Sequence, residues 1–146
     1  MKIKQLSVFL ENKPGRLSVP CKALAKAGIN ILTLSLADTR QFGILRLVLR
    51  DWQEAKKALE AAGCVVNVTE VIAIEVEDRP GGLERVLEIV EQAGVNLEYM
   101  YAFTFGAKDK AILVFRFEDP DAAIKLLQAK GVNVIGGVDL FGRASK

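Results

Sequence analysis

The chain contains the stretch Glu11-Asn12-Lys13-Pro14-Gly15-Arg16-Leu17 and, 66 positions later, its counterpart Glu77-Asp78-Arg79-Pro80-Gly81-Gly82-Leu83. The same offset relates Ala27-Gly28-Ile29-Asn30-Ile31 to Ala93-Gly94-Val95-Asn96-Leu97, with no gap. Internal repetition of this kind decides the architecture before any local pattern does. A polar turn is repeated here together with the apolar pattern, and polar turns are where binding residues concentrate.

Each copy predicts the same order of elements. Alternating apolar residues predict a strand before the Pro-Gly turn, and apolar residues at helical spacing follow the turn. Gly28 and Gly94 stand where the end of a helix favours a left-handed residue. The runs that follow are typical of strands and are predicted at 29–38, 44–49 and 65–68 in the first copy and at 95–105, 111–117 and 132–135 in the second.

A second helix is predicted in each copy between the third and fourth strands. Asp51 and Asp119 are expected to cap these helices, and Gly63 and Gly131 to end them. The offset between the copies is 68 from this point on, which places an insertion in the loop 106–109.

The predicted order is strand, helix, strand, strand, helix, strand, twice over. We therefore expect an α+β protein with two ferredoxin-like βαββαβ units, antiparallel sheets and the helices on one face. The first domain is expected over residues 1–69 and the second over 70–146, with residues 67–70 as a very short linker. Both alternating sets of the second strands are apolar, which indicates either a bulge or, as we favour, a second sheet face covered by another sheet or subunit.

The composition narrows the class of protein. The 146 residues are 51% hydrophobic and 26% charged, with a net charge of +2 and no histidine. Scattered basic residues and this small charge argue against nucleic acid as a partner. The apolar runs are too short to span a membrane and no leader opens the chain, so we expect a cytoplasmic protein. Cys21 and Cys64 are far apart, and we expect neither a metal nor a cofactor.

The repeated turn suits a free amino acid. Amide N–H groups at the start of a helix favour a carboxylate. Asn12 and Asp78 offer oxygens to an ammonium group, and Asn30 and Asn96 begin the following strands. The alternative is an ordinary helix-capping turn, in which Asn, Asp, Pro and Gly are all common.

Together, the turns and the Gly-apolar-Asn-apolar segments after them resemble the ACT domain, a regulatory module of enzymes of amino-acid metabolism. The resemblance implies two copies, a ligand at the junction of two modules, and contacts from the turn position of Asn12 and Asp78 and from Asn30 and Asn96. It also implies a homodimer and a separate metabolic enzyme as a partner. The ligand-binding residues expected on this basis are Asn12, Pro14, Gly15, Arg16, Leu17, Asn30, Ile31, Asp78, Pro80, Gly81, Asn96 and Leu97.

The copies differ at the turn. Asp78 replaces Asn12, and Gly82 replaces Arg16. Because an acceptor-only carboxylate repels a ligand carboxylate, the first copy is expected to be the better site. The alternative function is a structural or assembly module with degenerate sites. RNA binding and acylphosphatase-like hydrolysis are weaker alternatives, since the third strands lack the aromatic RNA-binding pattern and the turns lack a glycine-rich phosphate loop. We expect no catalytic residues.

Overall fold

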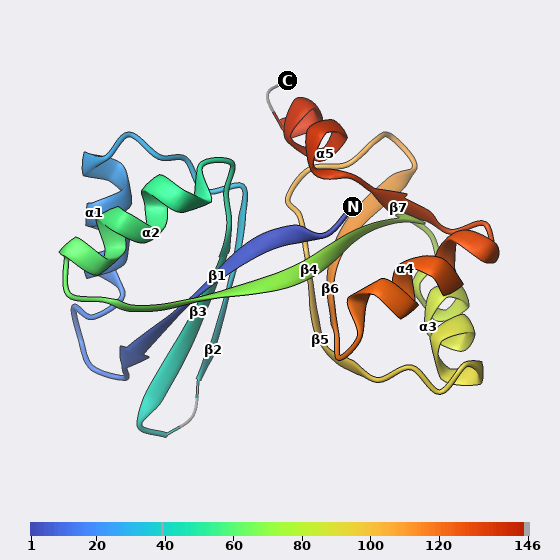
Figure 1. Ribbon diagram of the computed structural model, residues 1–146, viewed down its shortest axis with the longest axis horizontal. Helices are drawn as coiled ribbons and strands as arrows, with labels where there is room; N and C mark the ends of the chain where they lie inside the picture. Colours follow the sequence, from blue (N-terminus) through green and yellow to red (C-terminus); the bar gives the residue numbers. More distant parts are fainter. Residues whose placement is uncertain (39, 145–146) are drawn as a thin grey trace. The chain divides into compact units, whose positions relative to one another are not determined.

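The computed structural model describes residues 1–38 and 40–144 (Figure 1). The chain divides into two compact units. Lys4–Thr69 is called the first unit here, and Met1–Ile3 with Glu70–Lys146 is called the second unit. Among the described residues, no helix combines the length and the apolar character that crossing a membrane requires.

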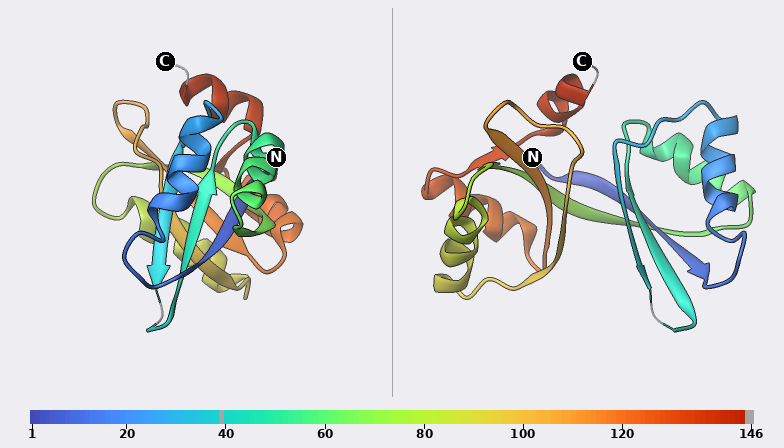
Figure 2. Two further views of the ribbon diagram at one scale, coloured as in Figure 1. Left: turned by 90° about the vertical axis from the view of Figure 1, so that its left-hand side faces the viewer. Right: turned by 180° about the vertical axis from the view of Figure 1, so that it is seen from behind.

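The first unit is a sheet with two helices on one face (Figure 2). Its strand order is β2-β3-β1-β4, and β3 runs antiparallel to both β1 and β2. This is the ferredoxin-like order expected from the sequence. The elements that contribute to it are β1 (Ile3–Glu11), α1 (Ser18–Lys26), β2 (Thr33–Asp38), β3 (Phe42–Val48), α2 (Trp52–Ala61) and the beginning of β4 (Val65–Glu77).

The second unit repeats this arrangement and adds a helix. β4 pairs with β6 on one side and with β7 on the other, and β5 pairs with β6. Lys2 belongs to this unit and forms ion pairs with Glu70 and Asp121. Besides the rest of β4, the elements are α3 (Gly82–Gln92), β5 (Leu97–Ala102), β6 (Lys110–Phe117), α4 (Pro120–Ala129), β7 (Asn133–Ile135) and α5 (Gly137–Ala144). The predicted fold class is confirmed.

Each unit has its own apolar core between its sheet and its helices. Alternate residues of the strand before the turn, such as Leu6 and Val8 in β1, are fully buried and pair with Leu47 and Leu45 of β3. Ile72 and Ile74 of β4 occupy the same positions in the second core. Because side chains alternate between faces along a strand, the intervening residues leave the core.

The helix ends follow the predicted signals with one exception. Gly28, Gly63, Gly94 and Gly131 all have positive φ angles, as expected of helix stops. The Asp119 side chain accepts a hydrogen bond from the Ala122 N–H at 3.1 Å, so its predicted capping is confirmed. Asp51 is the N-cap residue of α2, as predicted, but the capping hydrogen bond expected from its side chain is absent.

Three further features differ from the sequence prediction. Residues 67–70 are no linker, because they lie within β4, which runs unbroken from Val65 to Glu77. β5 contains a register shift between Leu97 and Tyr99, so a bulge, the less favoured of the two explanations for its apolar pattern, is present. α5 was not predicted, because Gly136, Gly137 and Gly142 have low helix propensity. The helix forms nevertheless, and its Leu140 is fully buried. Covering of the outer sheet face stays a prediction.

The fully buried Leu59 of α2 should be a main contributor to the stability of the first unit. Leu59→Ala should lower the free energy of unfolding by about 2–5 kcal/mol, because it removes buried methyl groups and leaves a cavity. Urea denaturation followed by circular dichroism measures this loss. Leu36→Ala, at a side chain that is 52% exposed, is the control and should change stability much less. Equal losses in the two variants would contradict the position of this core.

Candidate ligand-binding site

The turn of the first unit lies between β1 and α1 and is closed by backbone hydrogen bonds. The Asn12 N–H donates to the Gln41 carbonyl at 3.0 Å, and the Arg16 N–H donates to the Lys13 carbonyl at 3.2 Å. The Ser18 hydroxyl donates to the Gly15 carbonyl at 2.8 Å. Gly15 has a φ of 84°, a value that side chains other than glycine rarely adopt. The backbone of Asn12 is therefore held, while its side chain is exposed.

The turn of the second unit is similar but shorter. The Asp78 N–H donates to the Asp109 carbonyl at 2.9 Å, and the Gly82 N–H donates to the Arg79 carbonyl at 3.0 Å. α3 begins at Gly82, whereas α1 begins two repeat positions later, at Ser18. A Cβ atom on Gly82 would lie 2.0 Å from the Glu77 carbonyl oxygen. The absence of an arginine at this position thus follows from a close approach of the backbone.

Neither helix that follows a Pro-Gly turn is capped by a side chain. The N-cap residues are Leu17 for α1 and Gly81 for α3, and neither provides a hydrogen-bond acceptor. The first amide N–H groups of a helix have no partner within the helix. The Gly82 N–H of α3 already donates to the Arg79 carbonyl, and Pro20 in the first turn of α1 has no N–H. The other first-turn N–H groups lie at the positive end of each helix dipole.

The predicted site residues fall into two groups in each unit. One group lies at the turn, before the helix, and the other lies after the helix, around Asn30 and Asn96. α1 has nine residues and separates the two groups of the first unit by roughly 13 Å. Asn12, Asn30, Asp78 and Asn96 are all exposed. The structure does not bring the turn and the strand-start Asn of one unit to a common point.

Two of the predicted contact residues are partly buried and pack against the cores. Ile31 packs against the core of the first unit and Leu97 against that of the second. Pro14, Gly15, Arg16 and Leu17 are all exposed at the first turn, as are Pro80 and Gly81 at the second.

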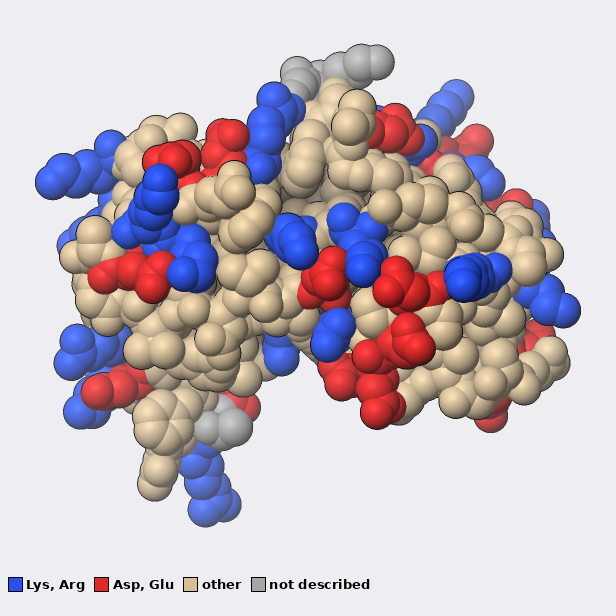
Figure 3. All heavy atoms as spheres, viewed as in Figure 1, with Lys and Arg blue, Asp and Glu red and all other residues tan. Residues whose placement is uncertain are grey.

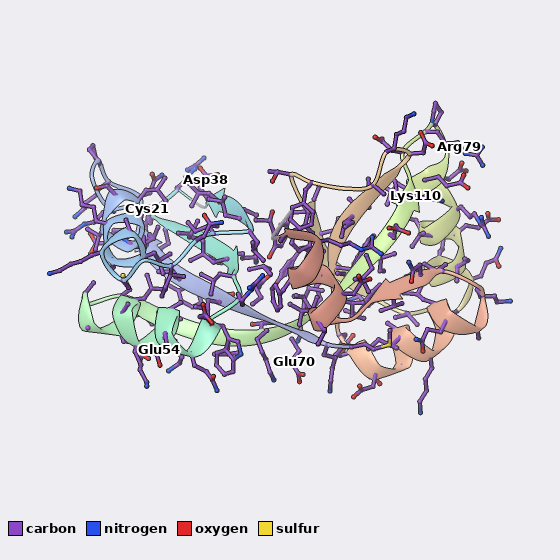
Figure 4. The ribbon with its side chains drawn as sticks, turned by 90° about the horizontal axis from the view of Figure 1, so that it is seen from above. Cys21, Asp38, Glu54, Glu70, Arg79 and Lys110 are labelled. Carbon is purple, nitrogen blue, oxygen red and sulfur yellow. The ribbon has the colours of Figure 1, made fainter. Side chains whose placement is uncertain are left out.

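A pocket of about 340 Å³ lies beside the turn of the second unit. Glu77 forms ion pairs there with Arg79 and, at 3.8 Å, with Lys110. Arg79 and Lys110 are labelled in Figure 4. The polar side chains that line this pocket are Glu75, Glu77, Arg79, Arg85, Lys110 and Asn133.

Glu75 is the most constrained charge of this pocket. It accepts hydrogen bonds from Arg143 of α5 at 2.5 Å and from the Asn133 amide at 3.2 Å. Arg143 also pairs with Asp139 at 3.0 Å. The hydrogen bond from Arg143 holds the pKa of Glu75 below its usual 4.5, against the opposing effect of burial. Sequence reasoning missed this network, because Arg143 lies on the helix that was not predicted.

The first unit has a pocket of about 340 Å³ at the equivalent place, and its lining is mostly apolar. Burial raises the pKa of the Cys64 thiol there. Arg16 and Glu11 are the charged residues of this lining. The other side chains of the pocket include Phe9, Leu10, Val19, Phe42 and Val65.

The remaining candidates for chemistry are structural. Cys21 and Cys64 are free thiols, both half-buried. Trp52 packs against the core of the first unit. The described part of the chain holds no group of three or more Cys, Asp or Glu residues that is arranged to hold a metal ion. On the face shown in Figure 3, basic and acidic side chains are interspersed.

Comparisons with known proteins agree on the architecture. The sequence model of the ACT domain pair family matches residues 1–142. Protein BT0572 from Bacteroides thetaiotaomicron is 40% identical, with a TM-score of 0.89 over 97% of this chain and 96% of that one. The ligand-free regulatory subunit of aspartate kinase from Thermus thermophilus is 16% identical, with a TM-score of 0.62 over 86% of this chain and 91% of that one. The chain has no match among the curated proteins.

The close approach at Gly82 makes a specific prediction. Gly82→Ala should lower the free energy of unfolding by about 1–3 kcal/mol, because the new Cβ meets the Glu77 carbonyl and the turn must shift. Gly136→Ala is the matched control in the same unit, since its Cβ would meet no atom within 4 Å. Chemical denaturation compares the two variants. A loss at Gly136 as large as that at Gly82 would contradict this account.

The Glu75–Arg143 pair predicts a dependence of stability on pH. Because the pKa of Glu75 is lowered in the folded state, its contribution is complete above 4.5 and is lost as the pH falls through the folded value. Arg143→Gln should therefore cost about 1 kcal/mol at neutral pH, and the variant should converge with the parent protein in acid. Denaturation curves over a pH series measure this.

Lys57→Gln, which removes an exposed ion pair with Glu54, is the control and should change little at any pH. A constant difference between Arg143→Gln and the parent protein across the whole series would show that the pair does not act through Glu75 ionisation.

Proposed function

The chain belongs to the ACT domain pair family, and on that premise we propose that it is a regulatory protein that binds a free amino acid at one or both of its Pro-Gly turns. We propose that the two modules comprise residues 1–69 and 70–146. The observation that carries this proposal is the pair of helices without a side-chain cap, α1 and α3, each beginning directly after a repeated turn. α4, which follows no such turn, is capped by Asp119, but α2 also lacks a side-chain cap, so it is the repeated turn together with the uncapped start that sets α1 and α3 apart.

An amino acid has the charges that such a turn can satisfy. Its carboxylate would accept from the first N–H groups of the helix, where the dipole favours negative charge. Its ammonium group would donate to the side-chain oxygen of Asn12 or Asp78, both of which are exposed beside the turn. The contacts proposed at the turns are Asn12, Pro14, Gly15, Arg16 and Leu17 in the first unit, and Asp78, Pro80 and Gly81 in the second.

The residues that start the second strands are proposed to bind a ligand held by another module. Asn30 and Ile31, like Asn96 and Leu97, follow the helix, so a small ligand at the turn of the same unit does not reach them. A ligand that contacts both a turn and a strand-start Asn must therefore lie between two modules, one of which provides each group. We propose that a second copy of the chain, in a homodimer, provides the other module.

The proposed regulatory role has no catalytic step of its own. The regulatory subunit of aspartate kinase has a similar fold, and its low identity to this chain carries the fold alone. We propose that this chain acts on a separate enzyme of amino-acid metabolism, since ACT domains as a family regulate such enzymes.

The alternative is a module for assembly whose ligand sites have degenerated. Its support is the uneven distribution of exposed apolar side chains. Eight of the ten large ones among the described residues lie in the first unit, which suits a protein contact. This alternative predicts a stable oligomer whose size and melting temperature do not respond to amino acids.

A thermal-shift screen of the common amino acids tests the two functions against each other. A ligand at about 100 times its dissociation constant should add about 2.7 kcal/mol to the free energy of unfolding, because it binds only the folded state. Asn12→Ala and Asp78→Ala then identify the turn involved, since only the variant at the occupied turn should lose the shift. Asn30→Ala tests whether a second module contributes.

Flat melting curves across the whole panel at millimolar concentration would reject amino-acid sensing. An unchanged oligomer in the same samples, measured by sedimentation, would then favour the assembly module.

A further inference from the structure

The two units have pockets at equivalent places, but the pocket of the first unit is lined mostly by apolar side chains and that of the second by charged ones. Both pockets lie where the end of the first strand, the Pro-Gly turn, the first helix and the start of the last strand meet, and both measure about 340 Å³. This size lies within the usual range of about 300–1,000 Å³ for small-molecule sites. At four equivalent lining positions the first unit has an apolar side chain and the second unit has a charged or polar one. The pairs, first unit before second, are Phe9 and Glu75, Val19 and Arg85, Phe42 and Lys110, and Val65 and Asn133.

The apolar residues of the first pocket are not required by the fold. The second unit builds the same arrangement with charged and polar side chains at those four positions. Phe9 and Phe42 are 41% and 54% exposed, and Val19 and Val65 are 37% and 64% exposed, so none of them fills a core. Exposed apolar groups around a hollow favour an apolar ligand, at about 25 cal/mol per Å² of area removed from water.

The first pocket also contains one charge of each sign at the turn. Arg16 and Glu11 both line it, and their closest charged atoms are 3.9 Å apart. Arg16 suits a carboxylate and Glu11 suits an ammonium group. In the second unit Gly82 stands in the place of Arg16, so this cation is specific to the first pocket.

We propose that the pocket of the first unit binds a free amino acid with a large apolar side chain, which lies against Phe9, Val19, Phe42 and Val65 while Arg16 and Glu11 hold the backbone charges. This inference rests on the proposed function and adds to it the unit and the class of ligand. It also assigns the two backbone charges to Arg16 and Glu11 in place of the helix N–H groups and Asn12, because Asn12 does not line this pocket. The second pocket does not bind this class, because the side chain would have to displace water from Glu75, Arg85 and Lys110 without replacing their hydrogen bonds.

Cys64 provides a reporter inside the proposed site. It is a half-buried free thiol in the lining of the first pocket, whereas Cys21 does not line it. In the full chain carrying Cys21→Ala, the reaction of Cys64 with a thiol reagent is followed with L-phenylalanine, L-leucine, L-serine or L-lysine. At about ten times the dissociation constant, an apolar ligand should slow the reaction about elevenfold, because only the empty pocket reacts. Serine and lysine should leave the rate unchanged.

A matched pair of variants tests the contact directly. Phe42→Lys introduces into the first pocket the residue of the second, and it should abolish both the protection of Cys64 and the thermal shift. Leu36→Lys makes the same change at a side chain of nearly equal exposure, 52%, that does not line the pocket, and it should preserve both effects.

The outcomes separate this inference from the proposed function. A thermal shift without protection of Cys64 would overturn this location and leave amino-acid binding intact. Equal protection by serine or lysine would overturn the class of ligand. Protection that rises with protein concentration alone would show a second copy of the chain in the pocket and overturn the proposal. A flat thermal-shift panel would reject the proposed function itself.

Discussion

The structure depends on the burial of alternate residues along one strand in each unit, β1 and the later part of β4. Leu6 and Val8, like Ile72 and Ile74, must face the helices, because they form the centre of each core. With a side-chain period of two, a shift of one residue would turn them all away from the helices, to the other face of the sheet. This constraint fixes where each strand ends, and hence where the Pro-Gly turn, the helix start and the pocket beside them lie. Phe9 and Glu75, further along these strands, lie outside the two cores, and there the two copies have diverged.

The divergence changes chemistry without changing architecture. Phe9 and Glu75 occupy the same strand position outside the core, yet one is an exposed ring and the other a carboxylate held by Arg143. α5 accounts for part of the difference, since it follows β7 and brings Arg143 to Glu75 in the second unit. In the first unit β4 continues where α5 would begin. The extra helix therefore adds a cation, Arg143, to the charged residues around the pocket of the second unit.

The sequence was sufficient for the elements whose cause is local or periodic. The alternation of apolar residues predicted the strands, and glycines predicted the ends of the helices. The internal repeat predicted the two units. It failed where the cause is a contact between distant residues. Gly82 read as a lost arginine, although it is required by the Glu77 carbonyl only 2.0 Å from where its Cβ would be. The turn and the strand-start Asn looked like one site, although a nine-residue helix lies between them. No local pattern indicated that the two aligned pockets would differ in polarity. Aligning the two copies residue by residue, with the offset of 66 before the loop and 68 after it, would have revealed the difference.

The charge state of the two pockets decides which one gains more from a ligand. In the second pocket Glu75 is already bound by Arg143 and Asn133, and Glu77 by Arg79 and Lys110. A zwitterion entering there must replace existing pairs, so its gain is the difference between two similar interactions. In the first pocket a zwitterion must likewise replace the ion pairs of Glu11 with Lys13 and Arg16, but the exposed apolar side chains add the gain from removing apolar area from water. Asn12 with Arg16 made the first copy the expected site on grounds of polar contacts; the stronger physical reason for the same preference is the apolar wall beside them.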